Sequence, residues 1–150
     1  MEKERFSLLL LEPHEIYFED FSVELRTKDE PKPIQGRLKI CSKSFLFEPR
    51  SVKSPLIKVQ LIHCSEIKEL SSPQNSLVVS CSQFACLLKN NVIAPYQFHR
   101  VNKSFVFSFD YIKVDDRVLP FCEQLKRASS LPASEQNDMI ATMVYSLHCR

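Results

Sequence analysis

Glycine and tryptophan are the residues that this sequence most clearly lacks, with one glycine (Gly36) and no tryptophan among 150 residues. A single glycine excludes the glycine-rich loops that cradle phosphates in nucleotide-binding enzymes, because those loops need several glycines. The sequence also lacks His-Glu-x-x-His and Gly-x-Ser-x-Gly, the motifs of zinc proteases and serine hydrolases. We therefore expect a protein that is not an enzyme and needs no cofactor.

Long apolar runs are absent as well. No stretch of about 18 apolar residues occurs, which is the length that a membrane-spanning helix needs. The apolar tetrad Leu8–Leu11 is too short, and its flanks are too acidic, for a signal peptide. These absences favour a cytoplasmic protein that meets membranes only at their surface.

The cysteines lack the close pairing that a zinc site shows. A structural zinc site usually has two ligands that lie two to four residues apart, repeated further along the chain. Here the six cysteines are scattered, mostly within apolar runs: Cys41, Cys64, Cys81, Cys86, Cys122 and Cys149. We expect buried free thiols and no metal.

What the sequence does contain is a β-hairpin pattern from Gly36 to Pro49. Apolar and basic residues alternate from Gly36 to Cys41, so Leu38 and Ile40 share one face of a strand and the cations share the other. Residues 42–44 form the turn. Phe45 and Phe47 then share one face of the returning strand, which ends at Pro49.

Further strand patterns surround this hairpin. A ladder of phenylalanines at 105, 107 and 109 predicts a strand with one face in the core. The other runs with strand-like alternation or β-rich composition are Phe6–Leu11, Ile16–Leu25, Leu56–Leu61, Ser76–Leu88 and Gln97–Val101. These patterns therefore predict an α+β protein that is mainly β, with six to seven strands, an order expected of a bent antiparallel sheet closed by a C-terminal helix.

The hydrophobic period changes to a helical one near the end of the chain. Val114, Val118, Cys122 and Leu125 recur at helical spacing, and Pro120 suits the first turn of the regular helix. A second helix is predicted from Ser134 to Leu147. Its apolar face could fold back on the sheet or pack against a following domain, so we expect one or two C-terminal helices.

Positive charge is concentrated in one block of the sequence. The net charge is only +2, which argues against a dedicated nucleic-acid binder, but residues 26–58 hold nine cations and three carboxylates, a local balance of +6. Six of these cations are candidate lipid-binding residues because they lie on or near the hairpin: Arg37, Lys39, Lys43, Arg50, Lys53 and Lys58. The alternative is that they only keep a sheet edge soluble and unpaired.

Several segments resemble the GRAM-like, pleckstrin-homology-like N-terminal module of the BEACH and WD-repeat proteins. They are Gly36–Ser44 followed by Phe47–Pro49, and also Lys3–Leu11, Val92–Tyr96, Arg127–Ser129 and Met139–Thr142. The resemblance implies a pleckstrin-homology/GRAM-like domain over residues 1–130. Residues 131–150 would be a helical extension leading toward a BEACH domain, which this chain does not contain.

The resemblance also implies a function. It implies a non-enzymatic adaptor, associated with anionic, phosphoinositide-containing membrane surfaces, in signalling from a receptor to sphingomyelinase. The alternative is a module that docks on a neighbouring BEACH domain or on receptor-complex proteins, without touching lipid. For that docking, the candidate contacts are the apolar side chains of the second helix: Met139, Met143 and Leu147.

Overall fold

One antiparallel sheet and two helices make up the described part of the chain. The computed structural model describes residues 11–28, 31–51, 53–70, 75–87, 96–110, 112 and 114–148. The strands are β1 (Tyr17–Arg26), β2 (Ile34–Cys41), β3 (Ser44–Pro49), β4 (Leu56–Gln60), β5 (Cys64–Leu70), β6 (Ser76–Cys81), β7 (Phe84–Leu87), β8 (Tyr96–His99) and β9 (Lys103–Phe109). The helices are α1 (Leu119–Ser129) and α2 (Ala133–His148).

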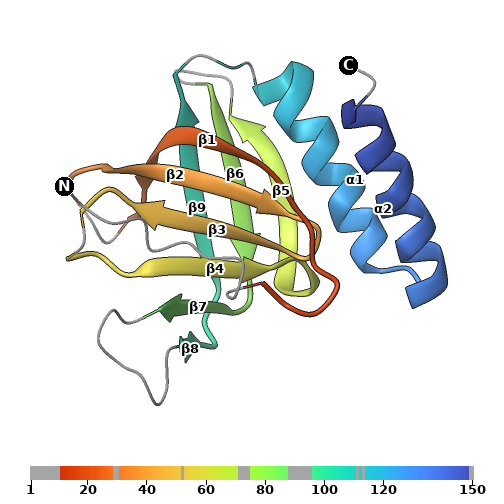
Figure 1. The fold of residues 1–150 in the computed structure, drawn as a ribbon. Helices are drawn as coiled ribbons and strands as arrows, with labels where there is room; N and C mark the ends of the chain where they lie inside the picture. The colour runs from red at the N-terminus through yellow and green to blue at the C-terminus, as the bar shows by residue number, and fades with distance from the viewer. Residues whose placement is uncertain are drawn as a thin grey trace.

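The sheet is strongly bent, and β1 is the strand that joins its two halves. The order across the sheet is β5-β6-β9-β1-β2-β3-β4-β7-β8. Strand β1 pairs with β2 over most of its length and with β9 over residues 23–26 only. Figure 1 shows β5, β6 and β9 running steeply across the direction of β2, β3 and β4. This arrangement confirms the predicted fold class, mainly β with a bent antiparallel sheet and C-terminal helices.

The predicted number of strands was wrong, because the described residues form nine strands rather than six or seven. A short 3₁₀ turn, Leu61–His63, separates β4 from β5, and residues 82–83 separate β6 from β7. No glycine or proline marks either break, so neither position was predictable from local pattern. The strand predicted at Phe6–Leu11 lies, except for Leu11, outside the described residues.

The predicted hairpin is confirmed as β2 and β3. Leu38 faces Phe47 and Ile40 faces Phe45 across the two strands, and all four side chains are buried. Gly36 lies opposite Pro49 in the same register. A side chain at residue 36 would collide with the carbonyl oxygen of Glu48, and its Cβ would lie 2.8 Å from the Phe47 ring. Only glycine fits there without a shift of the backbone.

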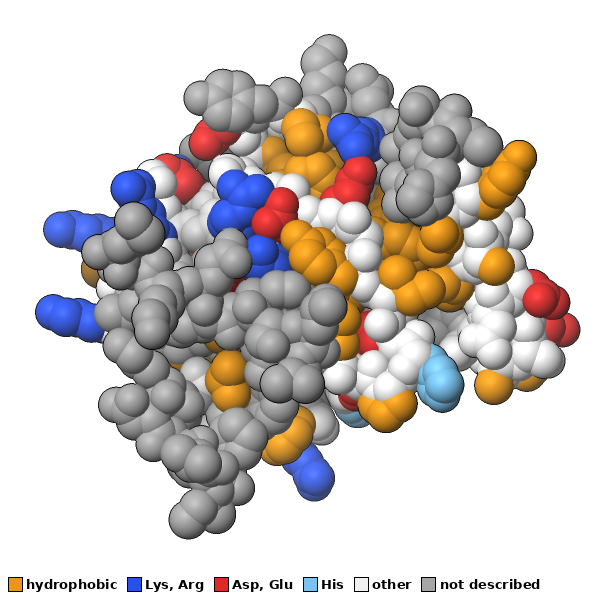
Figure 2. Space-filling view, viewed as in Figure 1, with side chains coloured by type: hydrophobic (Ala, Val, Ile, Leu, Met, Phe, Trp, Pro, Cys, Tyr) orange, Lys and Arg blue, Asp and Glu red, His pale blue; other side chains and the backbone are white. Residues whose placement is uncertain are grey.

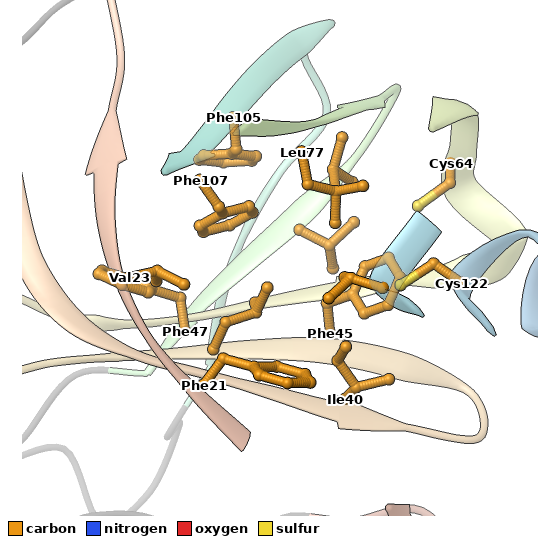
Figure 3. Packing of buried hydrophobic residues seen from close by; sticks show 14 of the residues in the cluster. Phe21, Val23, Ile40, Phe45, Phe47, Cys64, Leu77, Phe105, Phe107 and Cys122 are labelled. Carbon is orange, nitrogen blue, oxygen red and sulfur yellow. The ribbon is translucent and has the colours of Figure 1, made fainter. Parts of the chain in front are cut away.

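The core lies between the two halves of the sheet and is built largely from phenylalanine. Figure 3 shows Phe45 and Phe47 on one side of this core and Phe105, Phe107 and Leu77 on the other. The rings of Phe47 and Phe107 have centroids 5.7 Å apart, a common distance for an aromatic pair. The predicted phenylalanine ladder is therefore core packing.

The first helix closes the end of the sheet beside β5. Val114–Val118 forms a single π-helical turn before α1, and Pro120 lies in the first turn of α1 as predicted. The side chains of Cys122 and Leu125 are fully buried against the core. Helix α2 packs on α1, on the side away from the sheet (Figure 1). The helices thus cover one end of the bent sheet, and the loops at its other end remain at the surface.

Candidate functional site

The six candidate lipid-binding cations do not form one surface. Arg37 and Lys39 lie in the middle of β2, and Lys58 lies in β4. Lys43 is in the turn between β2 and β3, whereas Arg50 follows β3 and Lys53 lies in the next connection. The six residues of β3, about 20 Å at 3.3 Å each, separate Lys43 from Arg50. Each group must therefore be considered separately.

Arg37 and Lys39 both bind one carboxylate, that of Asp20. Arg37 donates to Asp20 from Nε at 3.0 Å and from Nη2 at 2.7 Å, and Lys39 Nζ donates to the same carboxylate at 2.9 Å. These hydrogen bonds hold the pKa of Asp20 well below its usual range, and the hydrogen bond from Arg37 has the largest effect. Burial of the carboxyl acts in the opposite direction. A pair of cations that already share a carboxylate gains little by meeting an anionic surface.

Lys39 and Lys58, two of the candidate lipid-binding residues, are buried. Their exposed fractions are 3% and 6%. Both flank Leu46 in the register of β2, β3 and β4, and Leu46 belongs to a second apolar cluster with Cys41 and Leu56. Alternation along a strand shows which side chains share a face, but it does not show whether that face is exposed to solvent. These two lysines are therefore unavailable to a lipid headgroup.

Lys43 makes hydrogen bonds that link the hairpin turn to the segment before β1. Its backbone N–H donates to Glu15 Oε2 at 3.1 Å, and Ser44 Oγ donates to the same oxygen at 2.7 Å. Its ammonium donates to the carbonyl of Pro13 at 3.2 Å. The turn also lines a pocket of about 370 Å³ between the sheet and the two helices, together with Ile62 and other side chains. Lys43 therefore has a structural role at the helical end of the domain.

Arg50 and Lys53 lie at the opposite end, and a third cation, Lys32, lies on the connection that precedes β2 at that end. The N–H of Arg50 donates to the carbonyl of Gln35 in β2 at 2.8 Å, so the connection after β3 begins beside the first residues of β2. The two connections and the first residues of β2 line a hollow of about 710 Å³. All three cations are exposed. We call Lys32, Arg50 and Lys53 the loop face.

Lys32 was not among the residues predicted for the site. It belongs to the same positive block of sequence, and it lies between Pro31 and Pro33, a pattern typical of an exposed loop. The sequence therefore shows that Lys32 is an exposed cation. It does not show that the loop of Lys32 lies at the same end of the sheet as Arg50, because the two residues are far apart along the chain. Figure 2 shows Lys and Arg side chains projecting at the left edge of the molecule, where these connections lie in Figure 1.

The apolar face of α2 is not a free surface, which corrects the second group of candidate contacts. Met143 is 6% exposed and belongs to the main core, and Met139 is half-buried. The Leu147 side chain lies outside the described part of the structure, although its backbone belongs to α2. Of the two options left open by the sequence, the structure supports the one in which this helix folds back on its own domain.

The described thiols are packing residues. Burial raises the pKa of Cys41 and Cys64 to about 12, so both remain protonated at neutral pH and are poor nucleophiles. All five cysteines in the described ranges are free. Within those ranges, no three His, Cys, Asp or Glu residues are grouped as metal ligands. Neither described helix combines the length and the apolar character needed to cross a bilayer.

Comparison with known families identifies a family that matches most of the chain. The family described as the FAN protein N-terminal PH domain matches residues 1–140. The match therefore covers the whole bent sheet, α1 and the first half of α2. It agrees with the resemblance carried by the segments Gly36–Ser44 and Met139–Thr142.

Proposed function

The chain belongs to the family of FAN N-terminal PH domains, and from this premise we propose that it is a non-enzymatic adaptor module that meets anionic, phosphoinositide-containing membranes through its loop face. The observation that supports the proposal is that Lys32, Arg50 and Lys53 are exposed on the two connections at one end of the β2–β3 hairpin, which jointly line a hollow. The setting that we propose is cytoplasmic signalling from a receptor to sphingomyelinase.

The loop face is suited to a membrane surface because its charges are exposed and lie at one end of the domain. A cation near an anionic leaflet contributes about 1 kcal/mol, so the three together contribute about 3 kcal/mol. Such binding is weak and reversible, as expected of a module that acts with other parts of a larger protein. In contrast, the nearby cation Arg37 is held by Asp20 and adds little.

Reversing the charges of the loop face tests the proposal. We expect Lys32→Glu, Arg50→Glu and Lys53→Glu together to weaken binding to phosphoinositide vesicles by at least about a hundredfold, because about 3 kcal/mol of attraction is lost and repulsion is added. Vesicle co-sedimentation at physiological salt measures the effect. Binding of the unchanged chain should disappear at ~1 M salt, where charges are screened within about 3 Å.

A matched control reverses three exposed cations elsewhere, with Lys68→Glu, Arg100→Glu and Arg127→Glu. Both triple variants change the net charge by the same amount. If binding depends on the loop face, the control variant should retain most of its binding to vesicles. Equal loss in both variants, or equal binding by the first variant and the unchanged chain, would contradict the proposal.

A second candidate function is docking on a neighbouring BEACH domain, with no lipid contact. The pocket between the hairpin turn and the helices favours it, because isoleucines at its rim are 37% exposed at Ile16 and 69% exposed at Ile62. Exposed apolar side chains around a pocket are typical of protein contacts. We expect a separately produced BEACH domain to associate with this chain at micromolar concentration in analytical ultracentrifugation. No association at high micromolar concentration would count against docking.

A further inference from the structure

The connection between β3 and β4 contains a serine that directly precedes a proline, in the sequence Lys53-Ser54-Pro55. Proline-directed protein kinases act on a serine or threonine in this setting. The proline keeps the residue before it out of the helical region, in the extended conformation that a kinase groove binds. We propose that Ser54 is a phosphorylation site for a kinase of this class and that its phosphate weakens the membrane contact of the loop face. The second part of this inference rests on the proposed function.

Ser54 lies in an accessible turn that is held by local hydrogen bonds. Its N–H donates to the carbonyl of Ser51 at 3.2 Å, and the N–H of Lys53 donates to the Ser51 hydroxyl at 3.3 Å. Ser54 is half-exposed and Pro55 is exposed, and the first buried residue after the turn is Leu56 of β4. Hydrogen bonds that close over two or three residues are lost at little cost when a short exposed segment opens. A kinase therefore reaches the Ser54 hydroxyl without unfolding the strands.

The phosphate would be attached within the loop face. Ser54 and Arg50 line the same hollow, and Lys53 is the residue before Ser54. None of the described residues that line this hollow is aspartate or glutamate, so the phosphate introduces a negative charge that the lining otherwise lacks.

That charge is large compared with the charge of the loop face. Phosphoserine carries about −1.5 to −2 at neutral pH, so it cancels half or more of the charge of three cations. Its oxygens also accept charge-assisted hydrogen bonds from arginine and lysine, which occupies groups that would otherwise meet a lipid headgroup. Phosphorylation of Ser54 is therefore expected to release the chain from an anionic membrane, as an electrostatic switch does.

The sequence offers an internal control in a second serine–proline pair, Ser72 and Pro73. No threonine precedes a proline, so Ser54 and Ser72 are the two sites of this kind in the sequence. Ser72 follows β5 in the chain and lies outside the positive block of residues 26–58. A phosphate on Ser72 adds the same charge without belonging to the loop face.

Treatment of the full chain with ATP and a mitogen-activated protein kinase tests the site. The γ-phosphoryl group passes to Ser54 Oγ as its bond to the β-phosphate breaks, ADP leaves, and the hydroxyl proton passes through the kinase's base to water. Tandem mass spectrometry should find phosphate on Ser54, none at that position in Ser54→Ala, and most of it lost in Pro55→Ala. A peptide of residues 49–57 checks the kinase, and phosphorylation of the peptide without phosphorylation of Ser54 in the folded chain would overturn the site.

Vesicle co-sedimentation tests the effect of the phosphate on the loop face. We expect phosphorylation of Ser54 to weaken binding to phosphoinositide vesicles about 10- to 30-fold, and a protein phosphatase to restore it. The kinase-treated Ser54→Ala variant, which keeps Ser72, should bind within about threefold of its untreated form. Unchanged binding after full phosphorylation of Ser54, or an equal loss in the Ser54→Ala variant, would overturn the switch. If the unmodified chain does not bind vesicles, the loop-face proposal fails, whereas the mass measurement still decides the phosphorylation site.

Discussion

Replacing Phe47 by alanine is expected to lower the free energy of unfolding by about 3–5 kcal/mol. The side chain is 1% exposed and its ring packs against that of Phe107 at a tilt of 46° in the core. Its neighbour across the hairpin region is Gly36, which has no side chain that could move into the space. Because the cavity cannot collapse easily, the cost should fall toward the upper part of this range. Guanidinium unfolding followed by circular dichroism measures it.

The matched control for this substitution is Phe98→Ala. Phe98 lies in β8 and is 60% exposed, so its removal should change the stability by less than about 1 kcal/mol. A domain of this size is stabilised by about 5–15 kcal/mol in total, so the Phe47 variant would lose a large fraction. A Phe47 variant as stable as the Phe98 variant would mean that the hairpin does not pack against β9 as the structure has it.

Replacing Asp20 by asparagine is expected to cost about 3 kcal/mol at neutral pH, because the cation of Lys39 would lose its closest carboxylate. Lys39 is 3% exposed, and its remaining carboxylate, Glu48, is 3.9 Å away. A buried cation that loses its nearest countercharge is compensated less well for the hydration it lost on folding, even with Glu48 and the Tyr17 ring close by. The control is Glu24→Gln on the same strand, where the carboxylate meets the exposed Arg26. It should cost less than about 1 kcal/mol.

The pH dependence of the Asp20 effect follows from the lowered pKa of its carboxyl. A carboxyl whose pKa is lower in the folded state than in the unfolded state stabilises the fold above its unfolded pKa of about 3.9. That stabilisation is lost as the pH falls below this value and approaches the lower folded pKa. The difference in stability between the unchanged chain and Asp20→Asn should therefore shrink between neutral and strongly acidic pH. A difference that stays constant down to acidic pH would contradict the assignment.

The adjoining Lys39 gives a further check on the same network. Lys39→Met removes the charge and keeps most of the apolar stem, so the double variant with Asp20→Asn should be more stable than Asp20→Asn alone. If the double variant is instead less stable than Asp20→Asn alone, the cost does not arise from an unpaired buried lysine.

Local pattern was enough to predict the hairpin, the phenylalanine ladder and both helices. The alternation of residues 36–49 fixed which side chains share a face, because the side-chain period in a strand is two. Pro120 marked the beginning of α1, because proline is tolerated only in the first turn. The number of strands was not predictable in the same way, because the breaks after β4 and β6 carry no glycine or proline.

The candidate site shows the limit of that reasoning. Six cations of one sequence block were predicted to act together, but Lys39 and Lys58 are buried around Leu46 and Lys43 lies at the helical end. Burial on the outer face of a sheet depends on what packs there from elsewhere in the chain. A sequence period carries no information about that packing.

By itself, the sequence determined the family, the mainly β fold and the concentration of positive charge in residues 26–58. Those properties depend on composition and on short-range order along the chain. Only the tertiary structure decided which cations are exposed and which meet one another. The connections that carry Lys32 and Arg50 lie at the same end of the sheet because β2 and β3 pair antiparallel. Such proximity is set by strand pairing over long sequence separations, and no local pattern encodes it.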